Sequence, residues 1–202
     1  MEGQCERAAF LYLARMFPGC PPLDRPAVIG GIGESATADQ IARRLARTIA
    51  FLQRDNSRIV VCIDRESRNE TAAVFAADIE AALNRELPRC GGSAVPVTVV
   101  VADRAFEAWL LADAEGIAAR HRVAPPSRRC WEGYMRPRPG TRAAGNYYGD
   151  DVLASMLGRY DKRRDGPRLF SELDTVTARA PCGPRTWGSR TLDRFLSAVG
   201  MV

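Results

Sequence analysis

The stretch SRIVVCIDRES, residues 57–67, decides the fold. Its middle, from Ile59 to Ile63, is an unbroken apolar run in which most residues are β-branched. Such a run is typical of a central parallel strand that is covered on both faces. The run ends abruptly in Asp64-Arg65-Glu66. The stretch therefore predicts a buried strand that finishes on two carboxylates.

Two further apolar segments indicate strands, AVIGGIG at 27–33 and PVTVVVA at 96–102. The segments around them carry apolar residues at helical spacing. These expected helices lie at 6–17, from Ser35 or Thr37 to about Arg54, at 69–87 and at 103–113. Because strands alternate with helices, we expect an α/β fold with a mainly parallel sheet flanked by helices.

The second half of the chain changes in character. Residues 122–148 are rich in Pro, Gly, Arg and aromatic residues and show little periodicity, which predicts a long loop. Short helices are expected near 150–158, 167–179 and 190–199. We therefore expect an α/β core at 1–121, with the loop and a C-terminal helical cap at 122–202 as an extension of the same domain.

Composition narrows the class of protein. A chain of 202 residues that is 46% hydrophobic and 26% charged is typical of a soluble globular protein. It contains neither an apolar run of about 20 residues nor a secretory signal pattern, so we expect a cytoplasmic protein. The net charge of +5 favours an acidic partner such as nucleic acid. A general compositional bias explains it equally well, because Lys162 is the sole lysine beside many arginines.

Cysteine and histidine usage excludes other classes. The six cysteines form no C-x-x-C pair, and the single histidine is His121. This pattern argues against a structural zinc site. It also argues against a Ser-His-Asp or Cys-His hydrolase, which would need His121 as its base.

Acidic residues follow the two strands expected at 59–63 and 96–102. Asp64 and Glu66 come after one, and Asp103 and Glu107 after the other. In parallel sheets, ligands gather at the carboxyl ends of the strands. Two positions apart in extended backbone, Asp64 and Glu66 would point to the same side, and carboxylates are ligands for Mg²⁺. The alternative is a solvated strand end at which Arg65 pairs with its neighbours.

Four short motifs resemble a known clan. They are E-G-x-x-E at 2–6, D-x-E at 64–66, E-A-W-L-L-A-D at 107–113 and Y-x-K at 160–162. Together they resemble the Toprim-like proteins and, more narrowly, an uncharacterised prokaryotic family with a domain of unknown function. The resemblance implies a Rossmann-like, Toprim-type sheet with Mg²⁺, or alternatively Mn²⁺, at its acidic end.

The resemblance also implies function. Toprim-like relatives cut, join or synthesise nucleic-acid backbones, so we expect a metal-dependent nuclease acting on DNA or RNA. It would serve in prokaryotic defence or DNA maintenance, with a separately encoded ATPase. Carried over, Glu2 is the acid/base group, and Asp64 and Glu66 hold the metal. In those relatives a strand precedes the E-G motif, so we expect the first strand to be missing or truncated here and encoded upstream of Met1.

Several residues have two interpretations. Glu107 is either a third metal ligand or a partner for the positive end of its helix. Lys162 either meets the phosphate charge in catalysis or is retained by chance. Trp109 is expected in the hydrophobic core, and the alternative is a surface on which bases stack. Nucleic-acid contact or a plain surface loop would explain the arginines of the long loop, namely Arg128, Arg129, Arg136, Arg138 and Arg142.

Two other functions compete with the nuclease. One is a non-catalytic module that binds nucleic acid or protein and keeps its acids for structure. The other is a phosphotransferase that uses the same metal cluster on a small substrate. Replacing Asp64 separates the first from the nuclease, because only an enzyme would lose activity and metal binding.

Overall fold

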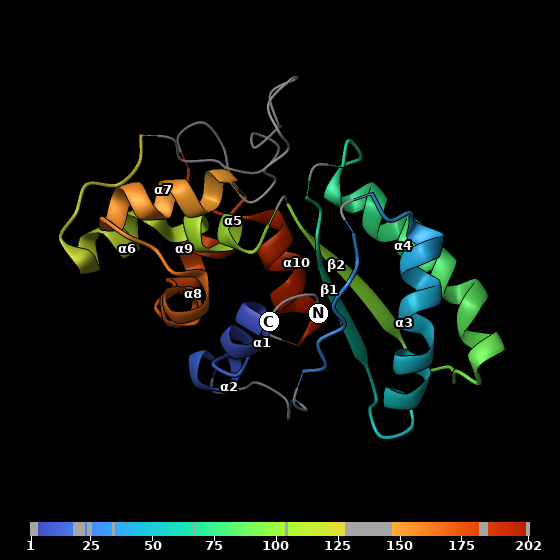
Figure 1. Ribbon diagram of the computed structural model, residues 1–202. Coiled ribbons are helices and arrows are strands. Elements are labelled where there is room, and N and C mark those ends of the chain that lie inside the picture. Colours follow the sequence, from blue (N-terminus) through green and yellow to red (C-terminus); the bar gives the residue numbers. More distant parts are fainter. Residues whose placement is uncertain are drawn as a thin grey trace.

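The computed structural model describes residues 4–17, 23, 26–33, 35–66, 68–103, 105–127, 147–181 and 186–200. Within these residues the sheet has two parallel strands, β1 (Ile59–Asp64) and β2 (Val97–Ala102), with helices on both sides (Figure 1). The mixed α/β class and the parallel sheet are therefore confirmed. The strand expected at 27–33 is wrong, because residues 26–33 form no strand.

The two strands are in register along their whole length. Ile59 lies opposite Val97, and Asp64 lies opposite Ala102, so both strands end at the same level. Successive side chains point to opposite faces of a sheet. Val61 and Ile63 accordingly join one hydrophobic cluster, whereas Cys62 joins the other. This alternation separates the molecule into two cores.

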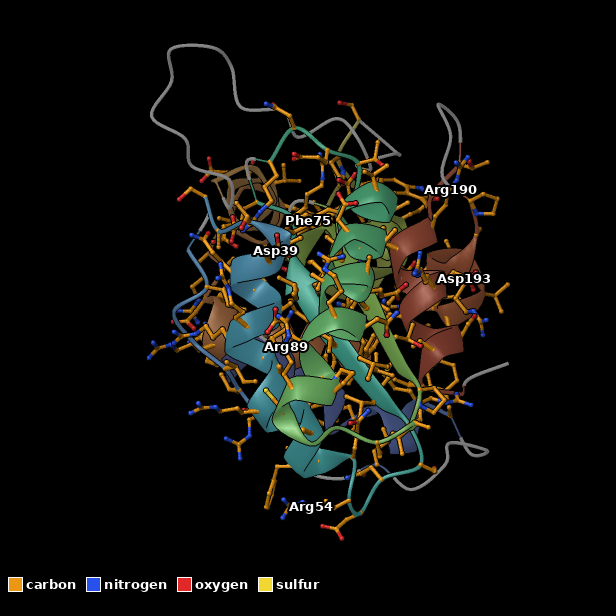
Figure 2. The ribbon with its side chains drawn as sticks, turned by 90° about the vertical axis from the view of Figure 1, so that its right-hand side faces the viewer. Asp39, Arg54, Phe75, Arg89, Arg190 and Asp193 are labelled. Atoms are coloured by element: carbon orange, nitrogen blue, oxygen red, sulfur yellow. The ribbon has the colours of Figure 1, made fainter. Side chains whose placement is uncertain are left out.

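Helices α3 (Ala38–Leu52) and α4 (Ala72–Glu86) cover one face of the sheet (Figure 2). Both begin at a threonine. The Thr37 hydroxyl accepts a hydrogen bond from the backbone N–H of Gln40 in a capping box, and Thr71 accepts one from Val74. Both predicted helices are confirmed. Thr37 is one of the two expected caps of α3, and the cap at Thr71 explains why α4 begins after residue 69.

The other face is covered by α1 (Gln4–Phe10), α5 (Glu107–Leu110), α8 (Lys162–Ser171) and α10 (Arg190–Ala198). Aromatic rings from these helices pack together. Phe10 stacks on Phe195 with ring centroids 4.4 Å apart, and Trp109 stacks on Phe195 at 5.0 Å. Trp109 is buried and its indole N–H donates to the Thr191 hydroxyl at 2.9 Å, which confirms its place in the core.

The remaining helices complete this layer. They are α2 (Leu13–Met16), α6 (Ala114–His121), α7 (Tyr147–Leu157) and α9 (Thr175–Arg179). The C-terminal helices expected as a cap therefore pack on one side of the sheet (Figure 1). No helix in the described part of the chain is both long and apolar enough to cross a membrane.

Two predicted helices have different bounds. The expected 167–179 helix is two helices, because Asp161 caps α8 six residues before Pro167 and Asp174 caps α9. The expected start near residue 167 therefore falls inside α8, which contains Pro167. The expected 6–17 helix is interrupted by a turn between Phe10 and Leu13, which leaves α1 and α2 as separate pieces.

Candidate active site

Four elements that are distant in the sequence bring charged side chains together beside the end of β1. Asp64 ends β1, Glu6 lies on α1, Glu107 begins α5 and Lys162 begins α8. The Lys162 Nζ lies 3.3 Å from Glu107 Oε1 and 3.8 Å from Glu6 Oε1. Asp64 is close enough that its charge acts on the pKa of Lys162. We call these four residues the acidic cluster.

The site depends on close helix contacts that only glycine permits. A Cβ at Gly149 would lie 2.5 Å from Glu107 Cβ, so the first turn of α7 can approach Glu107 only without a side chain there. A Cβ at Gly166 would lie 2.6 Å from Cys5 Sγ and 3.1 Å from the Tyr160 hydroxyl. The Cys5 thiol donates to the Lys162 carbonyl at 3.0 Å, which joins α1 to the start of α8.

Glu107 is fully buried and accepts hydrogen bonds from two side chains. The Tyr160 hydroxyl donates to Oε1 at 3.3 Å, and the Lys162 ammonium donates to Oε2 at 3.4 Å. The Asp150 carboxyl group lies close enough to Glu107 that its charge acts on the pKa of Glu107. Burial raises the pKa of both groups, so this pair can hold a proton that ordinary carboxylates would lose.

Burial and neighbouring charges shift the pKa values of Asp64 and Lys162 for different reasons. Burial raises the pKa of Asp64 well above its ordinary value, and repulsion from Glu6 and Glu107 adds to the increase. Burial alone would lower the pKa of Lys162, but attraction to Glu107, Asp64 and Glu6 outweighs it and raises that pKa. Lys162 therefore stays protonated at neutral pH. It is the positive counterpart of three carboxylates.

Cys5 lies beside the cluster but is not a nucleophile. Burial, with help from Glu6 and Glu107, raises the pKa of its thiol to about 12. Since the thiolate is the reactive form, Cys5 stays protonated and inert at neutral pH. Its role is the contact between α1 and α8.

Glu66 reaches the site by a different backbone from the one expected. The prediction assumed extended backbone, but β1 ends at Asp64 and Glu66 has a φ of 55°, in the left-handed region. Asp64 and Glu66 therefore do not lie on one side of a continuing strand. Glu66 is nevertheless buried, and its charge contributes to the raised pKa of Asp64. It belongs to the surroundings of Asp64 by way of a turn.

Arg65, which lies between the two acids, is occupied elsewhere. Its guanidinium forms a buried ion pair with Asp103. It also donates to the carbonyl oxygens of Arg68 at 3.1 Å and Glu70 at 2.9 Å. These contacts hold the turn after β1 against the turn after β2. Asp103 is thus engaged in an ion pair.

The E-A-W-L-L-A-D motif divides into one site residue and a structural remainder. Glu107 belongs to the acidic cluster, and the apolar residues from Ala108 to Ala112 are buried. Asp113 caps α6 by accepting from the backbone N–H of Gly116, and it also accepts from the backbone N–H of Asp174 at 2.7 Å. The motif therefore buries the short helix that carries Glu107, and Asp113 fixes the start of the helix that follows.

Some expected site residues lie outside the described residues. These are Glu2 of the first motif and the five loop residues Arg128, Arg129, Arg136, Arg138 and Arg142. Conversely, Glu6 and Asp150 were not expected as site residues. A signal for Asp150 exists, because Gly149-Asp150-Asp151 places a glycine and two acids near an expected helix start.

The chemistry of the cluster fits a divalent cation. Carboxylate oxygens are the ligands that Mg²⁺ prefers. Glu6 Oε2 and Asp150 Oδ1 are buried and have no hydrogen-bond partner in the described part of the chain, so both could accept a ligand. Among the described residues, no group of three His, Cys, Asp or Glu side chains has an arrangement ready for a metal. The Lys162 ammonium instead contacts the carboxylates.

Comparison with known proteins identifies the family. No curated protein and no solved structure matches the chain significantly. One family model matches residues 2–187, which includes every member of the acidic cluster. Because this match spans nearly the whole chain, the protein belongs to the family described as "Domain of unknown function (DUF4276)".

Proposed function

We propose that this protein hydrolyses phosphodiester bonds in nucleic acid with the help of Mg²⁺ or Mn²⁺. The observation that carries the proposal is the convergence of Asp64, Glu6 and Glu107 on one lysine at the carboxyl end of β1. The resemblance of its motifs to the Toprim-like proteins supports the same chemistry. That fold-level likeness is an analogy, and the acidic cluster is the physical argument.

The metal would be held by Asp64 together with Glu6 and Glu107, with Glu66 nearby. When bound, Mg²⁺ would neutralise charge on the phosphate and lower the pKa of a bound water. A cation is also what the site lacks, because three buried carboxylates face a single ammonium. Relief of that repulsion would favour metal binding.

The residues of the chain supply the remaining groups. In hydrolysis, a water oxygen bonds to phosphorus, the bond from phosphorus to the leaving oxygen breaks, and that oxygen takes up a proton. Asp150, whose pKa is raised by burial, is a source of this proton. The ammonium of Lys162 is a fixed positive charge for the phosphoryl oxygens. Glu2 remains our proposal for a further acid/base group.

The partners follow from the same chemistry. The substrate is nucleic acid, DNA or RNA, and the net charge of +5 favours its approach. A separately encoded ATPase and a role in prokaryotic defence or DNA maintenance are proposed by analogy with the Toprim-like proteins.

One observation favours a second function, the non-catalytic binding module. Lys162 lies within 4 Å of both Glu6 and Glu107. A buried ion-pair network of this kind can serve structure alone. In that case the acids would hold α1, α5 and α8 together, and no metal would bind.

Isothermal titration of Mg²⁺ and Mn²⁺ separates the two functions. The unmodified protein should bind, whereas Asp64→Asn and Glu107→Gln should lose binding and at least about 100-fold of the cleavage rate on single- and double-stranded DNA and RNA. The matched control is Asp78→Asn, which removes one charge from an exposed position on α4. No binding to the unmodified protein, or unchanged binding to Asp64→Asn, would overturn the nuclease proposal.

A further inference from the structure

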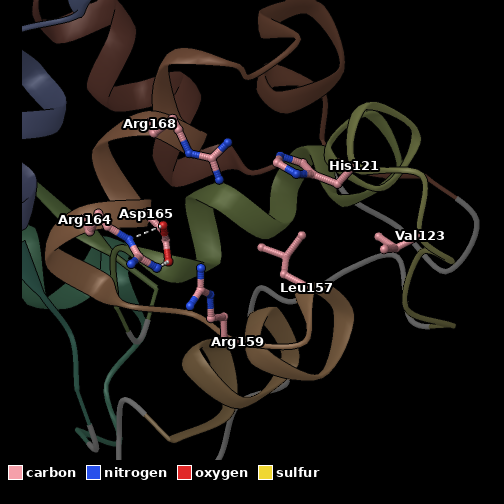
Figure 3. Close-up of a pocket in the computed structure, with 7 residues that line it drawn as sticks. All are labelled: His121, Val123, Leu157, Arg159, Arg164, Asp165 and Arg168. Carbon is pink, nitrogen blue, oxygen red and sulfur yellow. Dashed lines mark hydrogen bonds and ion pairs between the residues drawn. The ribbon is translucent and has the colours of Figure 1, made fainter.

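A cavity of about 440 Å³ is lined in part by α8, the helix that begins with Lys162 of the acidic cluster. Its walls come from α8, from the end of α7 and from the end of α6 (Figure 3). Arg159, Arg164, Arg168 and His121 line the cavity, and Asp165 is the one acid among the described lining residues. The cavity is therefore positively charged, unlike the acidic cluster.

The lining arginines differ in how well their charges are satisfied. Arg164 makes two hydrogen bonds to Asp165, both at 3.0 Å, which hold the guanidinium in place. Arg168 pairs with Glu172 at 3.2 Å, a carboxylate that His121 also contacts at 3.2 Å. Arg159 forms no ion pair with any described residue. Among the described residues, the Arg159 guanidinium thus has no anionic partner.

Asp165 adds one negative charge to the cavity, which is smaller than the positive charge of the lining arginines. The hydrogen bond from Arg164 lowers the pKa of Asp165 to about 2, so the carboxylate stays ionised. It accepts from the Arg164 side chain and from the backbone N–H of Asp161. Asp165 therefore neutralises Arg164, and Glu172 pairs with Arg168. Among the described residues, this leaves Arg159 as the lining arginine without a paired carboxylate.

The cavity and the acidic cluster share the first turns of α8. Lys162 faces the cluster, whereas Arg164 and Asp165 line the cavity. Residues three apart on a helix have Cβ atoms about 5–6 Å apart. A polyanion that reaches Lys162 would therefore have a neighbouring phosphate within reach of the cavity.

We propose that this cavity binds a phosphate group of the nucleic-acid substrate, with Arg159 as its main ligand and Arg164 and Arg168 as supports. The planar guanidinium fork matches phosphate oxygens in a bidentate manner. The nature of the substrate rests on the proposed function, but the affinity for phosphate does not. The phosphate is either terminal or internal to the strand, and both have the same charged oxygens.

Two probes test the cavity in the absence of divalent metal, so that neither cleavage nor metal binding enters the result. The first is pyrophosphate, measured by isothermal titration. The second is a single strand of about 12 nucleotides, as DNA and as RNA, labelled at its 3′ end and carrying either a 5′-phosphate or a 5′-hydroxyl. Its binding is followed by fluorescence anisotropy.

The decisive variant is Arg159→Ala, whose side chain is exposed, so the fold should persist. It should weaken binding of pyrophosphate and of the oligonucleotide by about tenfold or more. Arg159→Lys keeps the charge but lacks the fork, and it should recover only part of the loss. The matched control is Arg47→Ala, an exposed arginine on α3 that should change either affinity by less than about twofold.

The outcomes distinguish a terminal phosphate from an internal one. They also distinguish failure of the phosphate site from failure of the nuclease proposal. Loss of a preference for the 5′-phosphate in Arg159→Ala indicates a terminal phosphate, and equal weakening of both strands indicates an internal one. If Arg159→Ala and Arg47→Ala behave alike with both probes, the cavity is not a phosphate site. Phosphate binding that persists in Asp64→Asn would keep this proposal even if the nuclease proposal fails.

Discussion

On one face of the sheet, α3 and α4 pack aliphatic side chains and Phe75 against the strands. On the other face, aromatic rings pack among α1, α5, α8 and α10, and three of these helices also carry Glu6, Glu107 and Lys162. Both faces contain fully buried side chains. They differ in what burial does to the residues they contain.

Burial of apolar side chains stabilises the α3–α4 face. On the other face, burial of the carboxylates is unfavourable. Removing apolar side chains from water is favourable by about 25 cal/mol for each Å². Removing a carboxylate from water is unfavourable, which is why burial raises the pKa of Asp64 and Glu107. We infer that the α3–α4 face supplies stability that the acidic cluster consumes, as is common where a site needs groups held against their own preference.

Core truncation should have the largest effect. Ile79→Ala on the α3–α4 face should lower the free energy of unfolding by about 2–5 kcal/mol, and Phe106→Ala on the other face by about 3–5 kcal/mol. Both side chains are fully buried. Chemical denaturation measures the loss. The remaining folded fraction of Ile79→Ala should bind Mg²⁺ normally, whereas Phe106→Ala should bind it more weakly because Phe106 directly precedes Glu107.

Equal Mg²⁺ affinity in the folded fractions of both variants would show that the aromatic face does not position the cluster. The comparison of the two faces would then concern stability alone. A Tyr12→Phe variant, which changes a half-buried residue between α1 and α2, serves as a mild control on the same side of the molecule.

Replacing Asp64 should have a smaller effect that depends on pH. The folded-state pKa of Asp64 lies above its ordinary value of 3.8, so between these two values the folded state binds more protons than the unfolded state. The free energy of unfolding therefore falls as pH rises through that window. Above it, the ionised and buried Asp64 destabilises the fold. Asp64→Asn should be more stable than the unmodified protein at pH 8, and this advantage should disappear near pH 4.

Thermal unfolding at the two pH values measures this difference. Lys162 remains charged throughout, because its raised pKa places its own loss of stability above pH 10.5. Saturating Mg²⁺ at about 100 times its Kd should stabilise the unmodified protein by about 2.7 kcal/mol and leave Asp64→Asn unchanged. An Asp64→Asn protein that is less stable at pH 8 would mean that the attraction of Lys162 outweighs burial.

The smallest effect on stability is expected for the exposed ion pair between α3 and α4. Arg85 and Asp39 pair at 2.7 Å, but their side chains are 59% and 64% exposed. Exposed ion pairs contribute about 0.2–1 kcal/mol, and salt weakens them. Arg85→Ala should therefore change the free energy of unfolding by less than about 1 kcal/mol and leave Mg²⁺ binding intact. A larger loss in urea titrations would indicate that stability is not concentrated in the core.

Local patterns in the sequence predicted the elements whose signals are local. The β-branched runs at 59–63 and 96–102 became β1 and β2, and the threonine-capped stripes became α3 and α4. The glycine-rich segment 27–33 was mistaken for a strand because short apolar runs carry no period that separates strand from irregular backbone. The helix start expected near residue 167 lies too late because the stronger signal, the side-chain cap at Asp161, precedes it.

Part of the candidate site was predicted as well. Asp64, Glu107 and Lys162 were singled out, and the structure brings them together. Glu66 was expected on geometry that the turn after β1 replaces. Asp150 was not anticipated, because its partner Glu107 lies 43 positions earlier and no spacing rule connects them.

By itself, the sequence determined the α/β class, the membership in a family and the presence of acids at the ends of two strands. Only the tertiary structure decided that Glu6 and Lys162, which are 156 positions apart, meet beside Asp64. It also decided that arginines from the α7–α8 segment line a cavity to which α8, the helix of Lys162, contributes. The physical reason is that the spacing of apolar residues along the sequence indicates which face of a helix or strand is buried. Which buried faces meet depends on the packing of whole helices, through close contacts such as that of Gly166 with Cys5.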